Sequence, residues 1–310
     1  MFEIDTSNLA RYLDHRPEIA RAPWRIRSLG GGVSNTVLMA ECDGNRLVVK
    51  QALGRLRVAE EWLADRERIH RECAALRTLG PALPPGAVPR VLFEDRDNFI
   101  YAMEAAPAAA RDWKSLLLSG ECDPAVARQA AAILVAQVRA EAGTGFEDQH
   151  CFDQLRLDPY YRFTASRHPD LHEYFEDRIE ACRRDARALV HGDFSPKNLL
   201  VHGDLVTVID FEVIHFGDPN FDAAFLLNHL LLKQAHGVQG CRELALVFWE
   251  GVQSVMDEAS TIAHLGCLHL ARVDGKSPAE YLTDAEREAV RGRARDLIRN
   301  PPRRVKEIFD

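Results

Sequence analysis

The sequence predicts an α+β protein in which a small β-rich part precedes a larger, mainly helical part. Alternating apolar residues and tight-turn signals fill about the first hundred positions, whereas apolar residues at helical spacing fill the remainder. The composition supports a packed chain, because 46% of the 310 residues are hydrophobic and 28% are charged. Those values exclude a disordered or collagen-like protein, and the length allows one or two cores without disulfide or metal support.

The β-rich part begins with two strands within residues 24–50, joined by a turn at 42–45. An Asp-Gly pair between alternating apolar residues is a strong hairpin signal. Apolar residues at helical spacing then predict a helix over 58–79, which Gly80 and Pro81 would end. A further strand pair is predicted within 88–104, with its turn at 95–98.

The helical part follows an Ala- and Pro-rich connector at 105–110, so we expect two domains, 1–104 and 105–310. Asp123 before Pro124 is typical of a helix start. Two apolar runs, 199–201 and 205–209, flank a His-Gly-Asp turn and predict a β-hairpin inside this part. The expected helices are 124–142, 172–188, 221–233, 242–254 and 284–299.

The charge and the cysteine content indicate which partners the protein should have and in which compartment it should lie. The chain has 39 Lys and Arg against 47 Asp and Glu, a net charge of −8, so nucleic acid and anionic membranes are not expected partners. The seven cysteines contain no C-x-x-C pair, which favours reduced thiols. No basic, apolar leader is visible, and the longest apolar stretch is too short to cross a bilayer. We expect a cytoplasmic protein.

The most informative segment is H-G-D-F-S-P-K-N at 191–198. Asp193 precedes Asn198 by the spacing with which kinase catalytic loops hold a base and a metal ligand. The hairpin that follows returns the chain antiparallel, so Asp210 should lie beside Asn198. Two such oxygen ligands suit Mg²⁺, and Asp193 would accept the proton of an attacking hydroxyl. The alternative is that all three residues only cap turns.

Upstream residues favour the same chemistry. Gly31, Gly32, Ser34 and Asn35 belong to a glycine-rich turn whose backbone N–H groups could approach a phosphate; a flexible hairpin turn is the other interpretation. Lys50 ends a strand as V-V-K and is a candidate phosphate ligand, or otherwise an edge charge. Glu72 on the following helix is the candidate partner that orients this lysine, and Glu67 is the alternative.

The order of these motifs resembles the aminoglycoside phosphotransferase and choline kinase-like superfamily of small-molecule kinases, from about Ile26 to Lys233. The specific signatures are H-G-D-x-x-x-x-N and G-D-P-N-F-D at 217–222. The resemblance implies a protein-kinase-like bilobal fold, with ATP between a β-rich lobe and a helical lobe. It also implies the following roles: Asp193 as base, Asn198 and Asp210 as Mg²⁺ ligands, Lys50 and Glu72 at the phosphates, and Met103, Glu104 and Ala106 in a hinge that faces the adenine.

Other residues near the motif are expected to support it. Asp222 should brace the catalytic loop from behind, and His191 should be a packed scaffold residue rather than an acid or base. Lys197 either stabilises the moving phosphoryl group or is an exposed loop lysine.

The acceptor is less explicit in the sequence. V-V-K-Q-A-L at 48–53 is similar to methylthioribose kinases, although D-F-E at 210–212 and Asn198 depart from their usual pattern. We therefore expect a small hydroxylated metabolite, sugar-like or an amino-alcohol. An aminoglycoside phosphotransferase and a catalytically inactive nucleotide-binding protein remain alternatives. Two runs, L-D-P-Y-Y-R at 157–162 and A-R-V-D-G-K-S-P at 271–278, either line the acceptor site or only pack and link helices.

Overall fold

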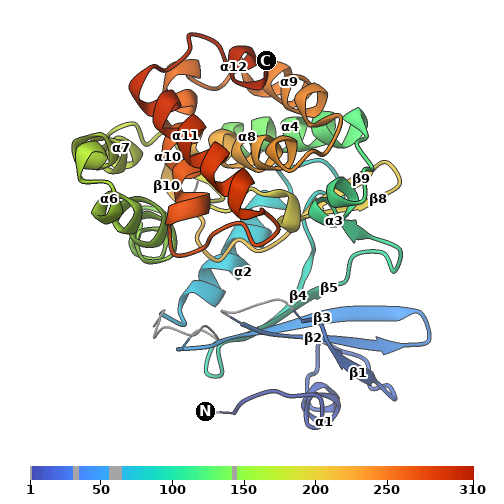
Figure 1. Cartoon of the computed structure of the whole chain (residues 1–310). Helices are drawn as coiled ribbons and strands as arrows, with labels where there is room; N and C mark the ends of the chain where they lie inside the picture. Colours follow the sequence, from blue (N-terminus) through green and yellow to red (C-terminus); the bar gives the residue numbers. More distant parts are fainter. Residues whose placement is uncertain (1, 31–34, 56–64, 142–144) are drawn as a thin grey trace.

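The computed structural model describes residues 2–30, 35–55, 65–141 and 145–310 and has the predicted two-part architecture (Figure 1). A five-stranded antiparallel sheet forms the N-terminal part, in the order β1-β2-β3-β5-β4. Its elements are α1 (Leu9–Asp14), β1 (Arg25–Ser28), β2 (Asn35–Cys42), β3 (Asn45–Ala52), α2 (Arg68–Leu79), β4 (Val91–Asp95) and β5 (Ile100–Glu104).

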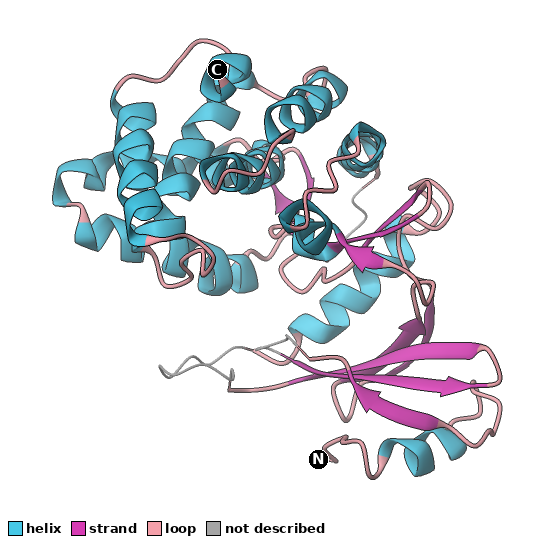
Figure 2. Ribbon diagram, turned by 45° about the vertical axis from the view of Figure 1, so that its right-hand side comes forward, coloured by secondary structure: helices cyan, strands magenta, loops and turns pink. Residues whose placement is uncertain are grey.

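Helices dominate the C-terminal part, which also holds two small sheets, β10-β7 and β6-β8-β9 (Figure 2). The strands are β6 (Arg111–Asp112), β7 (Ala188–Val190), β8 (Leu199–His202), β9 (Leu205–Val208) and β10 (His215–Gly217). The helices are α3 (Trp113–Leu118), α4 (Pro124–Arg139), α5 (His150–Phe152), a π-helical segment (Asp153–Arg162), α6 (Phe163–Arg167), α7 (His172–Arg184), α8 (Asn220–Ala235), α9 (Cys241–Val252), α10 (Glu258–Asp274), α11 (Asp284–Arg299) and α12 (Val305–Phe309).

The sheet has two apolar faces because side chains alternate along each strand. Leu47 and Val49 of β3 pack with α1 in a small outer core, whereas Val48 belongs to the main core on the other face. The same alternation directs Lys50 towards the inner face, where α2 contacts β3, β4 and β5. The fold thus brings the lysine towards the α2 helix.

The hairpins follow the sequence closely. Asp43 and Gly44 have φ values of 46° and 83° at the β2–β3 turn, the left-handed conformation that Asp-Gly favours. Leu199 pairs with Val208 in the β8–β9 hairpin. The predicted hairpin over 199–209 is therefore present, with Gly203 in its turn at φ 54°.

Several helix boundaries differ from the prediction: the helices expected over 124–142 and 172–188 end at Arg139 and Arg184. The helix expected over 58–79 begins at Arg68, because Asp65–Glu67 are turn and loop; residues 56–64 lie outside the described part. The run at 271–278 begins with the last turn of α10, which ends at Asp274. A helix start is weakly encoded when charged residues of high helix propensity continue on both sides of it. No helix in the described residues has the length and apolar character that a membrane span requires.

Candidate functional site

A buried ion-pair network joins the two parts of the protein at Lys50. Its Nζ lies 2.8 Å from both carboxylate oxygens of Glu72 on α2 and 2.9 Å from Oδ1 of Asp210, which follows β9. The backbone N–H of Phe211 also donates to Glu72, at 3.2 Å. The structure therefore brings together Lys50, Glu72 and Asp210 as the sequence predicted, while Glu67 is not part of the network.

The charges of this network stabilise one another. Burial alone would lower the pKa of Lys50, but Asp210 and Glu72 outweigh it and raise that pKa above its ordinary value. Burial alone would raise the pKa of Asp210, but Lys50 and Lys197 bring it well below its usual range. Burial raises the pKa of the Glu72 carboxyl. The charged form is nevertheless the one that its partners favour, because Glu72 accepts two contacts from Lys50 and one from the N–H of Phe211.

The catalytic-loop candidate, His191–Asn198, is held from behind by Asp222 at the start of α8. The backbone N–H groups of His191 and Gly192 donate to the Asp222 carboxylate at 2.6 and 2.8 Å, and Gln137 of α4 donates at 3.1 Å. Burial raises the pKa of Asp222 to about 7, against the effect of these three donors. The contacts match the bracing role expected of Asp222.

His191 is a fully buried member of the loop. Its Nε2 lies 3.1 Å from the carbonyl oxygen of Ile209, and its Nδ1 accepts the N–H of Asp193. Burial lowers the pKa of His191 to about 4, so the ring is neutral near pH 7. These bonds tie the loop to the end of β9 and agree with a scaffold role.

Asp193 lies inside this loop between two cations. Its Oδ2 lies 2.8 Å from Arg156 of the π-helical segment and 3.0 Å from Lys197. Burial alone would raise the pKa of Asp193, but these two cations keep it below its ordinary value. Its Oδ1 has no donor among the residues described, so one oxygen of an ionised carboxylate is available to a hydroxyl.

Asn198 and Asp210 lie at the two ends of the β8–β9 hairpin. The N–H of Ile209 donates to the Asn198 carbonyl at 3.0 Å, which joins these ends. The Asn198 side-chain amide donates to the carbonyl of Asp193 at 2.9 Å, and its Oδ1 accepts no hydrogen bond within the described ranges. Asp210 has a φ of 74°, which an aspartate tolerates better than most residues. Two oxygen donors suited to a divalent cation are thus close together.

A cleft of about 790 Å³ lies between the sheet and the helical part, and most of the predicted site residues line it. Lys50, Lys197, Asn198 and Asp210 form its charged end, and Met103, Glu104 and Ala106 lie along it as the hinge prediction expected. Its apolar wall consists of Leu29, Val37, Met39, Val48, Leu118, Leu200 and Ile209. Asp193 and Glu72 lie behind the charged end rather than in its lining.

The glycine-rich turn is only partly described. Gly31, Gly32 and Ser34 lie outside the described residues, so their predicted role stays a prediction. Asn35 lines the cleft, and its amide donates to Glu212 at 3.1 Å. Glu212 also lies 3.2 Å from Arg68 of α2. This contact across the cleft was not predicted, because residues so distant in the sequence carry no spacing signal.

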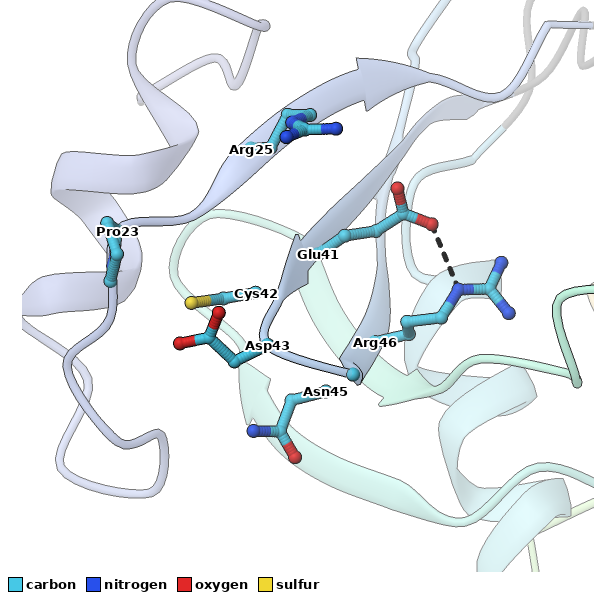
Figure 3. A pocket seen from close by; sticks show the side chains of 8 residues that line it. Pro23, Arg25, Glu41, Cys42, Asp43, Asn45 and Arg46 are labelled. Atoms are coloured by element: carbon cyan, nitrogen blue, oxygen red, sulfur yellow. Dashed lines mark hydrogen bonds and ion pairs between the residues drawn. The ribbon is translucent and has the colours of Figure 1, made fainter.

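A second hollow, of about 330 Å³, lies beside the β2–β3 turn (Figure 3). Its lining includes Arg25 and Cys42, and the ion pair between Glu41 and Arg46 crosses its edge at 2.9 Å. It contains none of the residues of the Lys50 network. The chemistry that the motifs predict is therefore concentrated in the larger cleft.

Sequence reasoning missed one residue of the site, Arg156. It is buried, and besides Asp193 it contacts the carbonyl of Gly192 at 2.7 Å. The run that the sequence singled out begins at the next position, Leu157. A lone arginine inside a mixed segment gives no periodic or motif signal, and only the packing of the π-helical segment on the loop directs it to Asp193.

The two-part fold with a charged cleft between its parts is kinase-like. The model of the family described as "phosphotransferase enzyme family" matches residues 25–240, and the chain belongs to that family. The match covers both the Lys50 network and the loop with Asp193.

Among individual relatives, methylthioribose kinase 2 of Oryza sativa subsp. japonica is 26% identical over 275 residues, which cover 74% of this chain and 62% of the relative. This chain therefore matches less than two thirds of the length of that relative. A solved choline/ethanolamine kinase family protein from Mesorhizobium loti is similar with a TM-score of 0.63 and 17% identity, over 96% of this chain and 95% of the other.

Amicoumacin kinase hAmiN, solved in complex with AMP-PNP, Ca²⁺ and Ami, is similar with a TM-score of 0.59 and 14% identity, over 96% of this chain and 95% of the other. At such identities the two solved structures show the fold alone. They confirm the protein-kinase-like bilobal fold, and the family match confirms the resemblance that the motifs indicated.

Gly192 provides a test of the loop geometry. It has a φ of 75°, and a Cβ there would lie 2.8 Å from Val213 Cγ2 and 3.2 Å from Phe152. We expect Gly192→Ala to lower the free energy of unfolding by about 3 kcal/mol, since backbone strain and overpacking add.

Gly120→Ala is the matched control, because Gly120 has a φ of 84° with nothing within 4 Å of the added Cβ. It should lose only about 1 kcal/mol. Denaturant unfolding of the two variants measures the difference, and equal losses would contradict a tightly packed loop.

Proposed function

We propose that this protein is an ATP-dependent O-phosphotransferase that phosphorylates a hydroxyl of a small metabolite, sugar-like or an amino-alcohol. The observation that carries the proposal is the gathering of Lys50, Asp210 and Asn198 at one end of the cleft, with Asp193 directly behind. Kinase relatives and the AMP-PNP complex of a structural neighbour support ATP as the donor.

The cleft suits a nucleotide in both size and polarity. Its apolar wall would take the adenine beside Met103, Glu104 and Ala106, and Lys50 would bind phosphate oxygens. Glu72 keeps the lysine extended towards the cleft through its two contacts at 2.8 Å. The glycine-rich turn, with Gly31, Gly32, Ser34 and Asn35, would cover the phosphates.

The donor set also fits a divalent cation. Mg²⁺ is often held by one or two protein oxygens together with phosphates and water. Asp210 and Asn198 provide such a pair, and the available Oδ1 of Asn198 agrees with a ligand role. In the described part of the chain no cluster of three or more His, Cys, Asp or Glu forms a metal site. When bound, the cation would neutralise phosphate charge; we propose Mg²⁺.

Asp193 would orient the acceptor and take its proton. Its Oδ1 accepts the hydroxyl hydrogen as the hydroxyl oxygen forms a bond to the terminal phosphorus of ATP. The bond from that phosphorus to the bridging oxygen breaks, and ADP leaves. Lys197, which lines the cleft and contacts Asp193, would stabilise charge on the transferred group.

An inactive nucleotide-binding protein is the second candidate. The intact set of Lys50, Glu72, Asp193, Asn198 and Asp210 favours the enzyme, because nucleotide binding alone does not require a buried carboxylate behind the phosphates. An aminoglycoside phosphotransferase is a narrower alternative, favoured by the family but by no contact in the described residues.

The role of Asp193 predicts a selective defect. Asp193→Asn should lower kcat by roughly 10²- to 10⁴-fold, because the amide cannot accept the hydroxyl proton. The affinity for AMP-PNP, measured by calorimetry, should stay within several-fold of wild type, since Asp193 is not in the cleft lining. Turnover near the wild-type rate would remove Asp193 from its role.

The metal role of Asp210 predicts a Mg²⁺-dependent defect. Asp210→Asn keeps the size of the side chain and tolerates the positive φ, but it removes the charge. The affinity for AMP-PNP in Mg²⁺ should fall by roughly 10-fold or more, and the affinity in EDTA should change far less. Equal changes in Mg²⁺ and in EDTA would contradict a metal role.

A further inference from the structure

Two runs that the sequence singled out near the acceptor site lie against each other. In the first run, 157–162, the carbonyl of Pro159 accepts the N–H of Lys276 at 3.1 Å. In the second, at the end of α10, Arg272 lies 3.4 Å from the hydroxyl of Tyr160. Burial alone would raise the pKa of Tyr160, but Arg272 and Arg156 lower it. Tyr160 therefore contacts Arg272, and its pKa also responds to the charge of Arg156, the arginine that contacts Asp193.

Arg272 is buried without a carboxylate partner. It is 8% exposed, and its Nη1 contacts the backbone and hydroxyl oxygens of Ser277. Its Nε is buried and has no hydrogen-bond partner, and no ion pair to it occurs among the described residues. A buried guanidinium with an unpaired N–H group is costly unless a ligand supplies the acceptor.

Lys233 of α8 is a second such cation. It is fully buried, and its only hydrogen bond in the described structure goes to the carbonyl of His229 at 3.4 Å. Burial lowers the pKa of Lys233 to about 7. The nearby thiol of Cys241 offers no negative charge, since burial raises its pKa to about 12. Glu280 and the Tyr281 ring offset only part of this burial cost, and no carboxylate forms an ion pair with Lys233 among the described residues.

Lys233 is linked to the lining of the cleft through one aromatic ring. The Tyr281 ring lies 5.6 Å from the Nζ of Lys233 and 5.8 Å from that of Lys114, and Lys114 lines the cleft. Burial lowers the pKa of His229 well below its ordinary value, and Lys233, Arg272, Lys197 and Lys114 all add to this effect. The pKa of His229 thus responds to cations from α3, α8, α10 and the catalytic loop.

The carboxylates of this region are already paired. Asp193 contacts Arg156 and Lys197, and Glu280 contacts Lys114. Arg272 and Lys233 therefore have no ion-pair partner of their own among the described residues. A polycationic aminoglycoside or a quaternary amine would be repelled by this arrangement.

We propose that the acceptor carries an anionic group, a carboxylate or a phosphate, which Arg272 and Lys233 bind while its hydroxyl lies at Asp193. This inference rests on the proposed kinase function and narrows its substrate class. An anion at this place would supply the acceptor that Arg272 Nε lacks and the counter-charge that Lys233 lacks.

Matched acceptors test the substrate class in the wild-type protein. ATP consumption is measured with glycerate against glycerol, homoserine against homoserine amide, and ribose 5-phosphate against ribose; methylthioribose, choline and kanamycin represent neutral and cationic acceptors. We expect the anionic member of at least one pair to exceed its partner by 10-fold or more in kcat/KM. Faster turnover of a neutral or cationic acceptor would overturn the inference and leave the kinase proposal standing.

Variants test the two cations with the acceptor so found. Lys233→Met and Arg272→Met should each raise its KM by 10-fold or more, with kcat within about three-fold, and Arg272→Lys should restore part of the loss. Lys306→Met, at an exposed lysine of α12, is the control and should change neither constant. Unchanged KM values in both cation variants would overturn the inference.

Anion binding is measured separately, so that it does not depend on turnover. With the protein saturated in ADP and Mg²⁺, malonate or phosphate should raise Tm more than chloride at equal ionic strength. General salt stabilisation acts on every variant alike. The extra shift in Tm should therefore persist in Lys306→Met and vanish in Lys233→Met and Arg272→Met. If either Met variant fails to fold, the charge-conserving variants Lys233→Arg and Arg272→Lys should retain the extra shift. No extra shift, or an equal shift in all variants, would overturn the inference even if the kinase activity is found.

Discussion

The ammonium of Lys50 is the contact on which the two-part structure of the site depends. It is a buried charge that is satisfied only when β3, α2 and the end of β9 lie together, because its partners Glu72 and Asp210 come from the last two. Removing one partner would leave a buried charge uncompensated, which costs more than the pair itself contributes. The cleft and its charged end are therefore coupled: the same interaction that closes the sheet part onto the helical part directs an amine and a carboxylate into the space between them.

The loop that holds Asp193 is kept in position by backbone groups more than by side chains. Asp222 accepts two successive backbone N–H groups, and the histidine ring contacts a carbonyl at the end of the hairpin. Positive φ values occur on both sides of this unit, at Gly192 and Asp210. Glycine adopts such a conformation freely, but at Asp210 it persists only where surrounding contacts fix it, and here those contacts are the ones that place the proposed base and the proposed metal ligands. Position and local strain thus have the same origin.

Much of this arrangement was predictable, for identifiable reasons. Asp193, Asn198 and Asp210 lie within one loop and hairpin, so spacing and antiparallel return were sufficient, and the α11 limits, Asp284–Arg299, were also predicted. For Lys50 and Glu72, the prediction also depended on the order of the motifs along the chain. The predicted start of α2 was wrong because charged residues continue through it. Arg156 and Lys233 gave no signal because their importance arises from packing between distant segments, whereas for Arg272 the sequence indicated only the run 271–278 that contains it. The boundary at residue 104, the role of each site residue and the compartment stay predictions.

The buried cations at the nucleotide end and on the acceptor side of the site differ in how their charge is compensated. At the nucleotide end, Asp210 and Glu72 raise the pKa of a buried lysine, so its charge is fixed before any ligand arrives. On the acceptor side, burial lowers the pKa of Lys233 to about 7, because no carboxylate among the described residues is close enough to form an ion pair with it. A charge that the fold itself compensates contributes to architecture, whereas one left without compensation gains most from a ligand of opposite sign. The energetic deficit at Lys233 and Arg272 is therefore an argument for recognition, since hydrophobic residues of similar volume would fill the same space at lower cost.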